Sequence, residues 1–417
     1  MGLELFPKSR RLLRIIIFLL LAFPAVRTYV THNTYGKQAR VQDLSFVNFH
    51  ATLSYFLGRV LPAKMTAQAQ ASDHYSFELP KITEHQPQRQ VVLIIGESLS
   101  MSRMGLYNST KQTTPQLNSL RDSGQVITRM GVSGGVSTDV SVPMLIHSTF
   151  GLDASKIISA QKSCLFRLAR QNGFITDFVS IQTPENLQHI TNFLCPSYIE
   201  HFKTGEPPSR EGGESVELDE KLLTSLQEMD WKKPHFIVLQ QRGSHSPYEN
   251  RYPSEGAQFP ITNEDPNEVK QSKHYENSVY YTDQVISKAV ALIEKSSPLP
   301  AEIIFTSDHG EALGENGQWG HGLLDPYVAE VPILYFSRNL ALRKQFDQAP
   351  KWIDHYYVTN FVRLLLGYQS ELPSTNASSS PSSRPSFTVL GLDLDGLDGY
   401  MQVVPSGDKL LRVKNSP

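Results

Sequence analysis

Short polar clusters follow three apolar runs of the chain, and their residue types are those that bind divalent metal ions. The clusters are GES (96–98) after VVLII, DHGE (308–311) after EIIFTS, and His245 shortly after FIVLQQ. Polar residues at the end of one strand are usually surface or capping residues. In an open α/β sheet, however, ligands bind beyond the carboxyl ends of the strands, so three clusters at one edge predict a site.

The adjacent pair Asp308 and His309 is the most informative of these clusters. Neighbouring residues in a strand point to opposite faces, but at a strand-to-loop turn both can bend towards one cation. A carboxylate oxygen beside an imidazole nitrogen suits Zn²⁺, with Mn²⁺ as the less favoured alternative. Gly310 allows the backbone to turn beside the site. His321 lies in the glycine-flanked loop GQWGHGL, which can fold over the metal; the alternative is an exposed loop histidine.

A nucleophile is predicted in GGVSTDVSVP (134–143), where Ser137 and Thr138 follow two glycines. A helix is expected to begin at Asp139 to Ser141, with Pro143 in its first turn. A hydroxyl at a helix N-terminus meets free N–H groups, which form a ready site for phosphate. Binding to a divalent cation would help that hydroxyl to lose its proton and attack phosphorus. A helix cap without chemistry is the alternative, and spacing alone does not separate the two.

The predicted elements that carry these residues alternate between strand and helix. Two further apolar runs, FITDFVS (174–180) and VPILYF (331–336), are typical of buried strands, and residues 218–229 and 274–294 have helical spacing. This alternation predicts an α/β fold with a central, mostly parallel sheet sandwiched by helices. We assign it to a catalytic domain of residues 89–372.

The N-terminal residues 1–30 resemble a membrane anchor. Four basic residues between Lys8 and Arg14 precede an apolar run of about twelve residues, which lengthens to about nineteen if its flanking arginines snorkel. A retained transmembrane helix is predicted because no clean A-x-A cleavage site follows; a signal peptide is the alternative. Both place the residues after position 30 outside the cytoplasm.

The remaining segments carry weaker signals. Residues 31–88 are predicted to be a linker with an amphipathic helix around residues 46–60. Residues 373–386 are rich in Ser and Pro and are predicted to be flexible, ahead of a C-terminal segment, 387–417. That segment contains LGLDLDGLDG, which lacks the spacing and closing Glu of an EF-hand.

Composition narrows the classes of function. The chain of 417 residues has a net charge of −2, so it has no global basic field and nucleic acid is excluded as a partner. Its two cysteines, Cys164 and Cys195, form no CxxC pair, which excludes a cysteine-built zinc site. In an oxidising compartment they could form one disulfide; two unpaired buried thiols are the alternative.

Taken together, the motifs resemble those of the bacterial phosphoethanolamine transferases of the alkaline phosphatase/sulfatase superfamily. The likeness covers roughly residues 90–340 and consists of GES, TTPQL, VSTDVSVP, RGSHSPYENRYP, YENSVYYTD and SDHGEALGENGQWGHG, in the order of the family.

The resemblance implies a role for each matched residue. Glu97, Thr138, Asp308 and His309 match the zinc ligands, and Thr138 also matches the nucleophile. His245 and His321 match histidines that bind the transferred phosphate group or a second metal. The implied enzyme lies in the bacterial inner membrane with its catalytic domain in the periplasm. It takes phosphoethanolamine from phosphatidylethanolamine onto Thr138 and passes it to lipopolysaccharide (lipid A or a core sugar) or to another envelope glycan.

Some features depart from that family. Many relatives have several transmembrane helices and several disulfides, and the SGxK-type segment of the lipid A-modifying relatives is missing between the two cysteines. A sulfatase activity is disfavoured because the Cys/Ser-x-Pro-x-Arg signature is absent. A phosphoglycerol transferase, which uses a similar set of residues, is the main alternative. A catalytically silent membrane scaffold is the alternative from another class.

Overall fold

The computed structural model describes residues 79–206, 218–370 and 386–413, together with the single positions 53, 57 and 372. The chain divides into a unit of residues 1–76 and a second unit of residues 77–417. The predicted membrane anchor, the amphipathic helix around residues 46–60 and the Ser/Pro-rich segment fall, but for single positions, outside the described residues. Within the described ranges, no helix has both the length and the apolar character needed to cross a membrane.

An eight-stranded sheet forms the centre of the second unit, in the order β10-β2-β9-β6-β1-β5-β3-β4. Only β9 runs antiparallel to its neighbours; the other pairings are parallel. The strands are β1 (Gln90–Gly96), β2 (Val126–Val132), β3 (Ile175–Ser180), β4 (His201–Lys203), β5 (His235–Gln240), β6 (Ala301–Ser307), β9 (Glu330–Ser337) and β10 (Trp352–Asp354).

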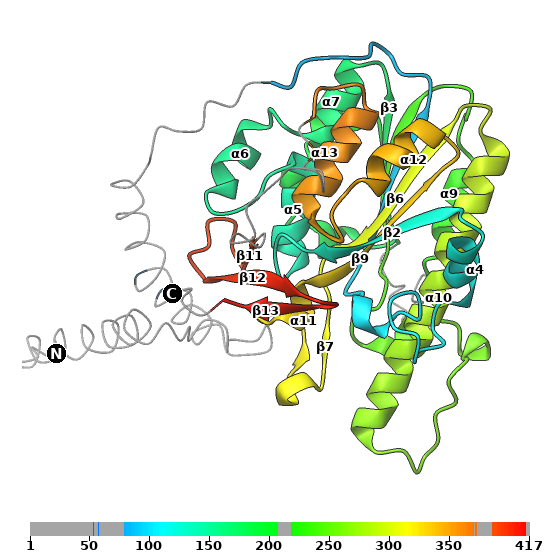
Figure 1. The fold of residues 1–417 in the computed structure, drawn as a ribbon, viewed down its shortest axis with the longest axis vertical. Coiled ribbons are helices and arrows are strands. Elements are labelled where there is room, and N and C mark those ends of the chain that lie inside the picture. The colour runs from blue at the N-terminus through cyan, green and yellow to red at the C-terminus, as the bar shows by residue number, and fades with distance from the viewer. Residues whose placement is uncertain are drawn as a thin grey trace, which may run out of the picture. The chain divides into compact units, whose positions relative to one another are not determined.

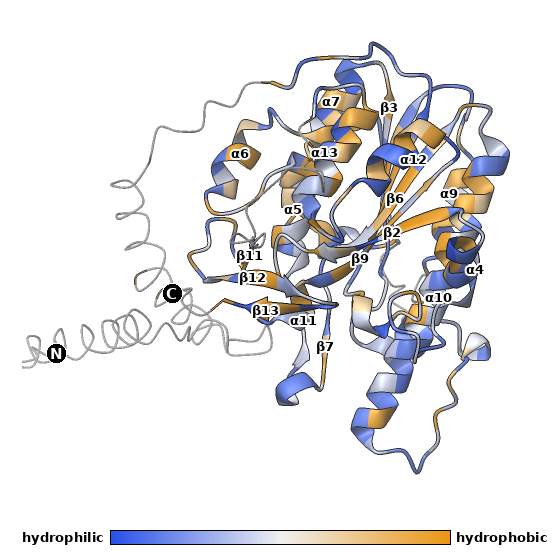
Figure 2. Ribbon diagram, in the orientation of Figure 1, coloured by the Kyte–Doolittle hydropathy of each residue, from blue (hydrophilic) through white to orange (hydrophobic). Residues whose placement is uncertain are grey.

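Helices cover both faces of this sheet (Figure 1). Alternate residues of β1 belong to different cores: Val91 and Leu93 pack with α5, α7, α12 and α13, whereas Val92 and Ile94 pack with α4, α9 and α10. In Figure 2 the central strand β6 is coloured mostly as hydrophobic, whereas covering helices such as α9 and α12 carry both hydrophobic and hydrophilic residues. The helices are α4 (Pro115–Asp122), α5 (Thr138–His147), α6 (Ala154–Ala160), α7 (Leu165–Gln171), α8 (Pro184–Leu187), α9 (Lys221–Gln227), α10 (Asn267–Ser296), α11 (Pro326–Ala329), α12 (Leu340–Asp347) and α13 (His355–Leu365).

The C-terminal segment forms a separate three-stranded antiparallel sheet of β11 (Phe387–Leu390), β12 (Tyr400–Ser406) and β13 (Lys409–Arg412). It pairs with the loop before α5, because Leu390 exchanges backbone hydrogen bonds with Gly134 and Val136. The loop between β11 and β12 is organised by Asp393, whose carboxylate accepts three backbone N–H groups. This carboxylate therefore holds the backbone of the loop together.

The apolar runs and helical patterns of the sequence correctly located part of the central sheet and two of its helices. All five apolar runs form strands of the central sheet, and the two helical patterns become α9 and the longer α10. The strands β2, β4 and β10 were not predicted, and β9 is antiparallel. A short two-stranded sheet, β7 (Ala312–Leu313) with β8 (Trp319–Gly320), also went unpredicted. The expected start of α5 was wrong by one residue: the helix begins at Thr138, and Pro143 lies inside it rather than in its first turn.

Candidate active site

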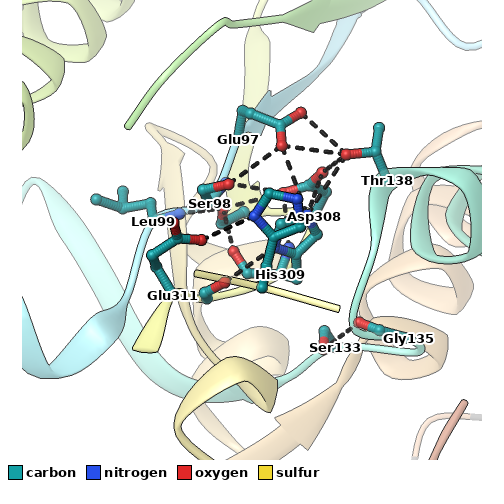
Figure 3. A network of polar contacts seen from close by, with 12 residues as sticks. Glu97, Ser98, Leu99, Ser133, Gly135, Thr138, Asp308, His309 and Glu311 are labelled. Carbon is teal, nitrogen blue, oxygen red and sulfur yellow. Dashed lines mark hydrogen bonds and ion pairs between the residues drawn. The ribbon is translucent and has the colours of Figure 1, made fainter. Parts of the chain in front are cut away.

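The predicted metal ligands come from the ends of two neighbouring strands and from one helix start (Figure 3). Glu97 directly follows β1, and Asp308 and His309 directly follow β6. Because β1 and β6 are paired in parallel with Gly96 opposite Ser307, both clusters emerge at the same edge of the sheet. Thr138 is the first residue of α5.

The Thr138 hydroxyl lies at the centre of this group. Its Oγ1 is 2.7 Å from Asp308 Oδ2 and 3.1 Å from each carboxylate oxygen of Glu97. His309 Nε2 lies 3.4 Å from the same hydroxyl and 3.5 Å from Glu97 Oε1. The possible ligand atoms of Glu97, Asp308 and His309 all lie within 4.8 Å of one another.

The electrostatics of the group fit a bound cation. Glu97 and Asp308 are 1% and 0% exposed, and within the described part of the chain neither carboxylate pairs with a lysine or arginine. Burial, and then the charge of Asp308, raise the pKa of Glu97 well above its usual range. Two buried carboxylates in contact repel each other unless a proton or a cation lies between them. Oxygen and imidazole donors are those that zinc prefers.

The ring of His309 is oriented for such a role. Its Nδ1 lies 2.9 Å from the carbonyl oxygen of Gly310, to which the Nδ1–H can donate. The lone pair of Nε2 then faces Glu97, Asp308 and Thr138. Burial lowers the pKa of His309 despite the nearby Asp308, which favours the neutral ring that can bind a metal.

The backbone around Glu97 is closely constrained. Ser98 has φ +56°, a left-handed conformation, and its N–H donates to Asp308 Oδ1 at 3.1 Å. The carbonyl oxygen of Ser98 accepts the hydroxyl of the buried Tyr275 at 2.7 Å. A Cβ on Gly243 would lie 2.5 Å from the carbonyl oxygen of Glu97, so only glycine fits there. These contacts hold the first carboxylate in place.

The start of α5 does not use its hydroxyls as a cap. Ser137 occupies the N-cap position without a side-chain capping bond, and its Oγ has no partner among the described residues. The Thr138 hydroxyl instead faces the carboxylates. The capping alternative is therefore not observed for either residue.

The two predicted histidines lie beside this group. The His321 ring is 4.6 Å from the His309 ring and 4.9 Å from the His245 ring, centroid to centroid. His321 Nδ1 lies 3.0 Å from Glu311 Oε2, and Glu311 Oε1 accepts the Tyr248 hydroxyl at 2.7 Å. Burial lowers the pKa of His321, but the hydrogen bond and charge of Glu311 outweigh it and leave that pKa above its usual value. Burial, with the charge of His321, lowers the pKa of His245 to about 4.

A cavity of about 470 Å³ opens onto Thr138 and Glu97. It is lined by polar side chains from several elements: Ser137, Asp139, Gln182, Glu185, Asn186, Gln188, His189, Gln240, Arg242, His245, Arg251 and His321. The cavity therefore gives a ligand access to Thr138 and to both histidines.

All six predicted site residues thus lie at one edge of the sheet. No role was predicted from the sequence for Glu311, Tyr248, Gln182 or Gln240. Glu311 lies in the DHGE cluster and Tyr248 in RGSHSPYENRYP, so both had a signal in the quoted motifs. The two glutamines had none beyond their place at strand ends.

Comparison with known proteins places the chain in a family. The chain belongs to the sulfatase family, whose model matches residues 89–356, more than half of the chain.

The curated relatives have names that state an activity. The chain is 26% identical to the Kdo(2)-lipid A phosphoethanolamine 7''-transferase of Escherichia coli over 329 residues, which are 72% of this chain and 56% of that protein. It is 27% identical to the phosphoethanolamine transferase EptA of E. coli over 69% of this chain and 54% of that protein. The chain therefore spans about half the length of these relatives.

Solved structures share the fold at lower identity. The periplasmic domain of EptC from E. coli matches with a TM-score of 0.63 and 17% identity, covering 82% of this chain and 98% of that domain. The integral membrane protein EptA from Neisseria meningitidis matches with a TM-score of 0.58 and 22% identity, covering 88% of this chain and 71% of that protein. A zinc complex of the EptC domain matches with a TM-score of 0.59 and 18% identity, covering 70% of this chain and 87% of that chain.

Proposed function

We propose that the protein is a metal-dependent phosphoethanolamine transferase that uses Thr138 as its nucleophile. The observation that carries this proposal is the position of the Thr138 hydroxyl, 2.7–3.4 Å from Asp308, Glu97 and His309. The names of the curated relatives support the transferred group.

Glu97, Thr138, Asp308 and His309 would hold the metal ion, with Zn²⁺ favoured over Mn²⁺ by the donor set and by the zinc complex of the EptC domain. A bound Zn²⁺ would favour the ionised threonine and stabilise charge on the phosphate oxygens. Thr138 attacks the phosphodiester of phosphatidylethanolamine, and the bond to diacylglycerol breaks. An acceptor oxygen then takes phosphoethanolamine from Thr138.

The two histidines serve the oxygens of the phosphate group. Since Glu311 engages Nδ1 of His321, the Nε2 of that ring is available to exchange a proton with substrate. His245 lines the cavity beside it, and its depressed pKa makes it a weaker base than His321, so it serves as a neutral hydrogen-bond partner of the phosphate group. Glu311 and Tyr248 act as positioning residues for His321.

The surroundings of the cavity favour phosphoethanolamine over the alternative, phosphoglycerol. The carboxylates of Asp139 and Glu185 are exposed and line the same cavity as Thr138. A carboxylate attracts the ammonium of ethanolamine, whereas glycerol carries no charge.

We further propose that the enzyme acts at the bacterial inner membrane with its catalytic domain in the periplasm. The donor is a membrane lipid, and the acceptor is lipopolysaccharide (lipid A or a core sugar) or another envelope glycan. The relatives named for lipid A modification and the periplasmic and integral membrane structures support this placement. The predicted anchor of residues 1–30 would keep the domain near its donor.

Intact mass spectrometry of the zinc-supplied protein, mixed with phosphatidylethanolamine in detergent, tests the proposal. We expect an adduct with the mass of phosphoethanolamine on Thr138, and no adduct in Thr138→Ala, which should keep its fold and lose transfer by at least about 10³-fold. Thr224→Ala, in an exposed threonine of α9 outside the cavity, is the matched control and should form the adduct as the wild type does. An adduct on Ser137, or a phosphoglycerol adduct from phosphatidylglycerol alone, would contradict the assignment.

A further inference from the structure

The cavity beside Thr138 contains a buried hydrogen-bond donor that the protein itself does not use. Gln240, the last residue of β5, is 1% exposed and lines the cavity. Its Nε2 has no partner among the described residues. Leaving a buried donor unpaired is costly, and such groups are rare in folded proteins unless a ligand or water satisfies them.

Neighbouring hydrogen bonds favour one orientation of this buried carboxamide. The backbone N–H of Gln182 donates to Ser180 Oγ at 3.0 Å, and the Ser180 hydroxyl donates to Gln240 Oε1 at 3.3 Å. Exchanging the oxygen and nitrogen of Gln240 would place its NH₂ group against that hydroxyl hydrogen. The Ser180 bond therefore favours the orientation that leaves the NH₂ group without a protein acceptor.

A second unused donor lines the same cavity. The Ser137 hydroxyl, directly before the nucleophile, is buried at the start of α5 and has no partner among the described residues. The first N–H groups of this ten-residue helix also lack intrahelical acceptors. The Arg242 side chain lines the cavity as well. Unpaired donors together with a cationic side chain point to a ligand group rich in anionic oxygens.

We propose that the Gln240 carboxamide is a substrate-binding residue that donates to a non-bridging phosphoryl oxygen, with the Ser137 hydroxyl as a second donor to the same phosphate group. This inference deepens the proposed function, since it names the contacts of the phosphoryl group beyond the predicted metal ligands. It requires only that the bound ligand carries a phosphate group, whether free or esterified.

Titration calorimetry of the full chain supplied with Zn²⁺, with O-phosphoethanolamine and inorganic phosphate as probes, tests this role. We expect Gln240→Leu to raise the dissociation constants of both probes by about 10-fold or more, because a hydrogen bond to a charged group is lost. Gln240→Glu keeps the shape of the side chain but presents a carboxylate to the phosphate, so we expect at least the same loss. Gln227→Leu, in an exposed glutamine of α9 outside the cavity, should stay within about 2-fold of the wild type.

Thermal unfolding without phosphate separates this role from a structural one. Because Gln240→Leu also removes the acceptor of the Ser180 hydroxyl, it should unfold somewhat earlier than the wild type without phosphate, and phosphate should no longer raise its unfolding temperature. A variant whose unfolding temperature rises with phosphate as much as that of the wild type would contradict the proposal. If Gln240→Leu does not fold, the isosteric Gln240→Glu decides.

The inference is overturned if Gln240→Glu binds both probes as tightly as the wild type does. If the wild type binds phosphate through Gln240 but forms no phosphoethanolamine adduct, the proposed function fails and this binding role stands. If the adduct forms while Gln240→Glu binds phosphate normally, only this inference fails.

Discussion

At the scale of single residues, the site is defined by the electrostatic repulsion between two buried carboxylates. Two carboxylates, Glu97 and Asp308, are fully buried around one hydroxyl, and the described residues include no lysine or arginine that pairs with either. The burial of such a pair is unfavourable while both are ionised. A divalent cation would relieve that repulsion, so the site favours metal binding at the expense of the metal-free protein.

This repulsion predicts that one substitution raises the stability of the metal-free protein and weakens metal binding. Because burial raises the pKa of Glu97 in the folded protein, ionising this group costs stability as pH rises above its usual value near 4.5. Glu97→Gln should therefore stabilise the metal-free protein at pH 7.5 by about 1–4 kcal/mol and reduce Zn²⁺ affinity by about 10-fold or more. Chemical unfolding of the chelated protein measures the stability, and zinc titration measures the affinity. Glu249→Gln, in an exposed carboxylate, should change neither quantity. A lower metal-free stability in Glu97→Gln would contradict the proposed repulsion.

The sequence was informative about the metal-site candidates for a physical reason. Glu97, Asp308 and His309 follow apolar runs directly, and parallel pairing brings strand ends together. The partners of those residues could not be found this way. Tyr275 and Gly243 reach Glu97 or Ser98 from segments remote in sequence, and their contacts leave no periodic pattern.

At the scale of elements, the loop that leads into α5 and Thr138 is held between two sheets. Leu390 of β11 pairs with Gly134 and Val136 on one side of the loop, and α5 packs against the central sheet on the other. The C-terminal sheet is in turn attached to the central one, because Glu330 at the start of β9 accepts the N–H of Leu410 in β13 at 2.8 Å. The position of Thr138 therefore depends on both sheets.

The attachment through Glu330 should make stability depend on pH. Burial raises its pKa to about 7, although the bond from Leu410 opposes this. A raised pKa means that the folded protein prefers the neutral carboxyl, so its contribution is complete below about pH 4.5 and is lost as pH rises through 7. Glu330→Gln should exceed the wild type in unfolding free energy by about 1–3 kcal/mol at pH 8, and by almost nothing at pH 4.5. Equal effects at both pH values in urea unfolding would contradict this account.

A disulfide joins the elements on one face of the sheet. Cys164, just before α7, is bonded to Cys195 across a sequence separation of 31 residues, and both lie in the core that contains α5 and α13. Closing a loop of this length should contribute about 3–4 kcal/mol. The double variant Cys164→Ala/Cys195→Ala should lose about that amount in urea unfolding, and dithiothreitol should lower the wild type towards it. Insensitivity of the wild type to reduction would indicate that the thiols are unpaired.

At the scale of the whole molecule, the layered α/β architecture was predictable because buried parallel strands are continuous apolar runs. The remaining strands could not be predicted in this way. In β2, VITRMGV mixes polar with apolar residues, because four of its seven residues are only partly buried. The strand β4 is short and exposed at the sheet edge, and the C-terminal sheet has no helical or alternating pattern long enough to identify it.

The matched relatives extend beyond this chain, since it spans about half of their length. An isolated periplasmic domain, that of EptC, is covered to 98% by the shared fold. The family match covers residues 89–356, which include all six predicted site residues.

Crystals of the chain grown with Zn²⁺ and measured on both sides of the zinc absorption edge test the central claim most directly. We predict an anomalous peak about 2.0–2.2 Å from oxygens of Glu97, Thr138 and Asp308 and from Nε2 of His309. Asp308→Asn crystals from the same solution should lose it. Zinc bound only elsewhere, for example between Glu311 and His321, would contradict the proposal that these four residues hold the metal ion at the nucleophile.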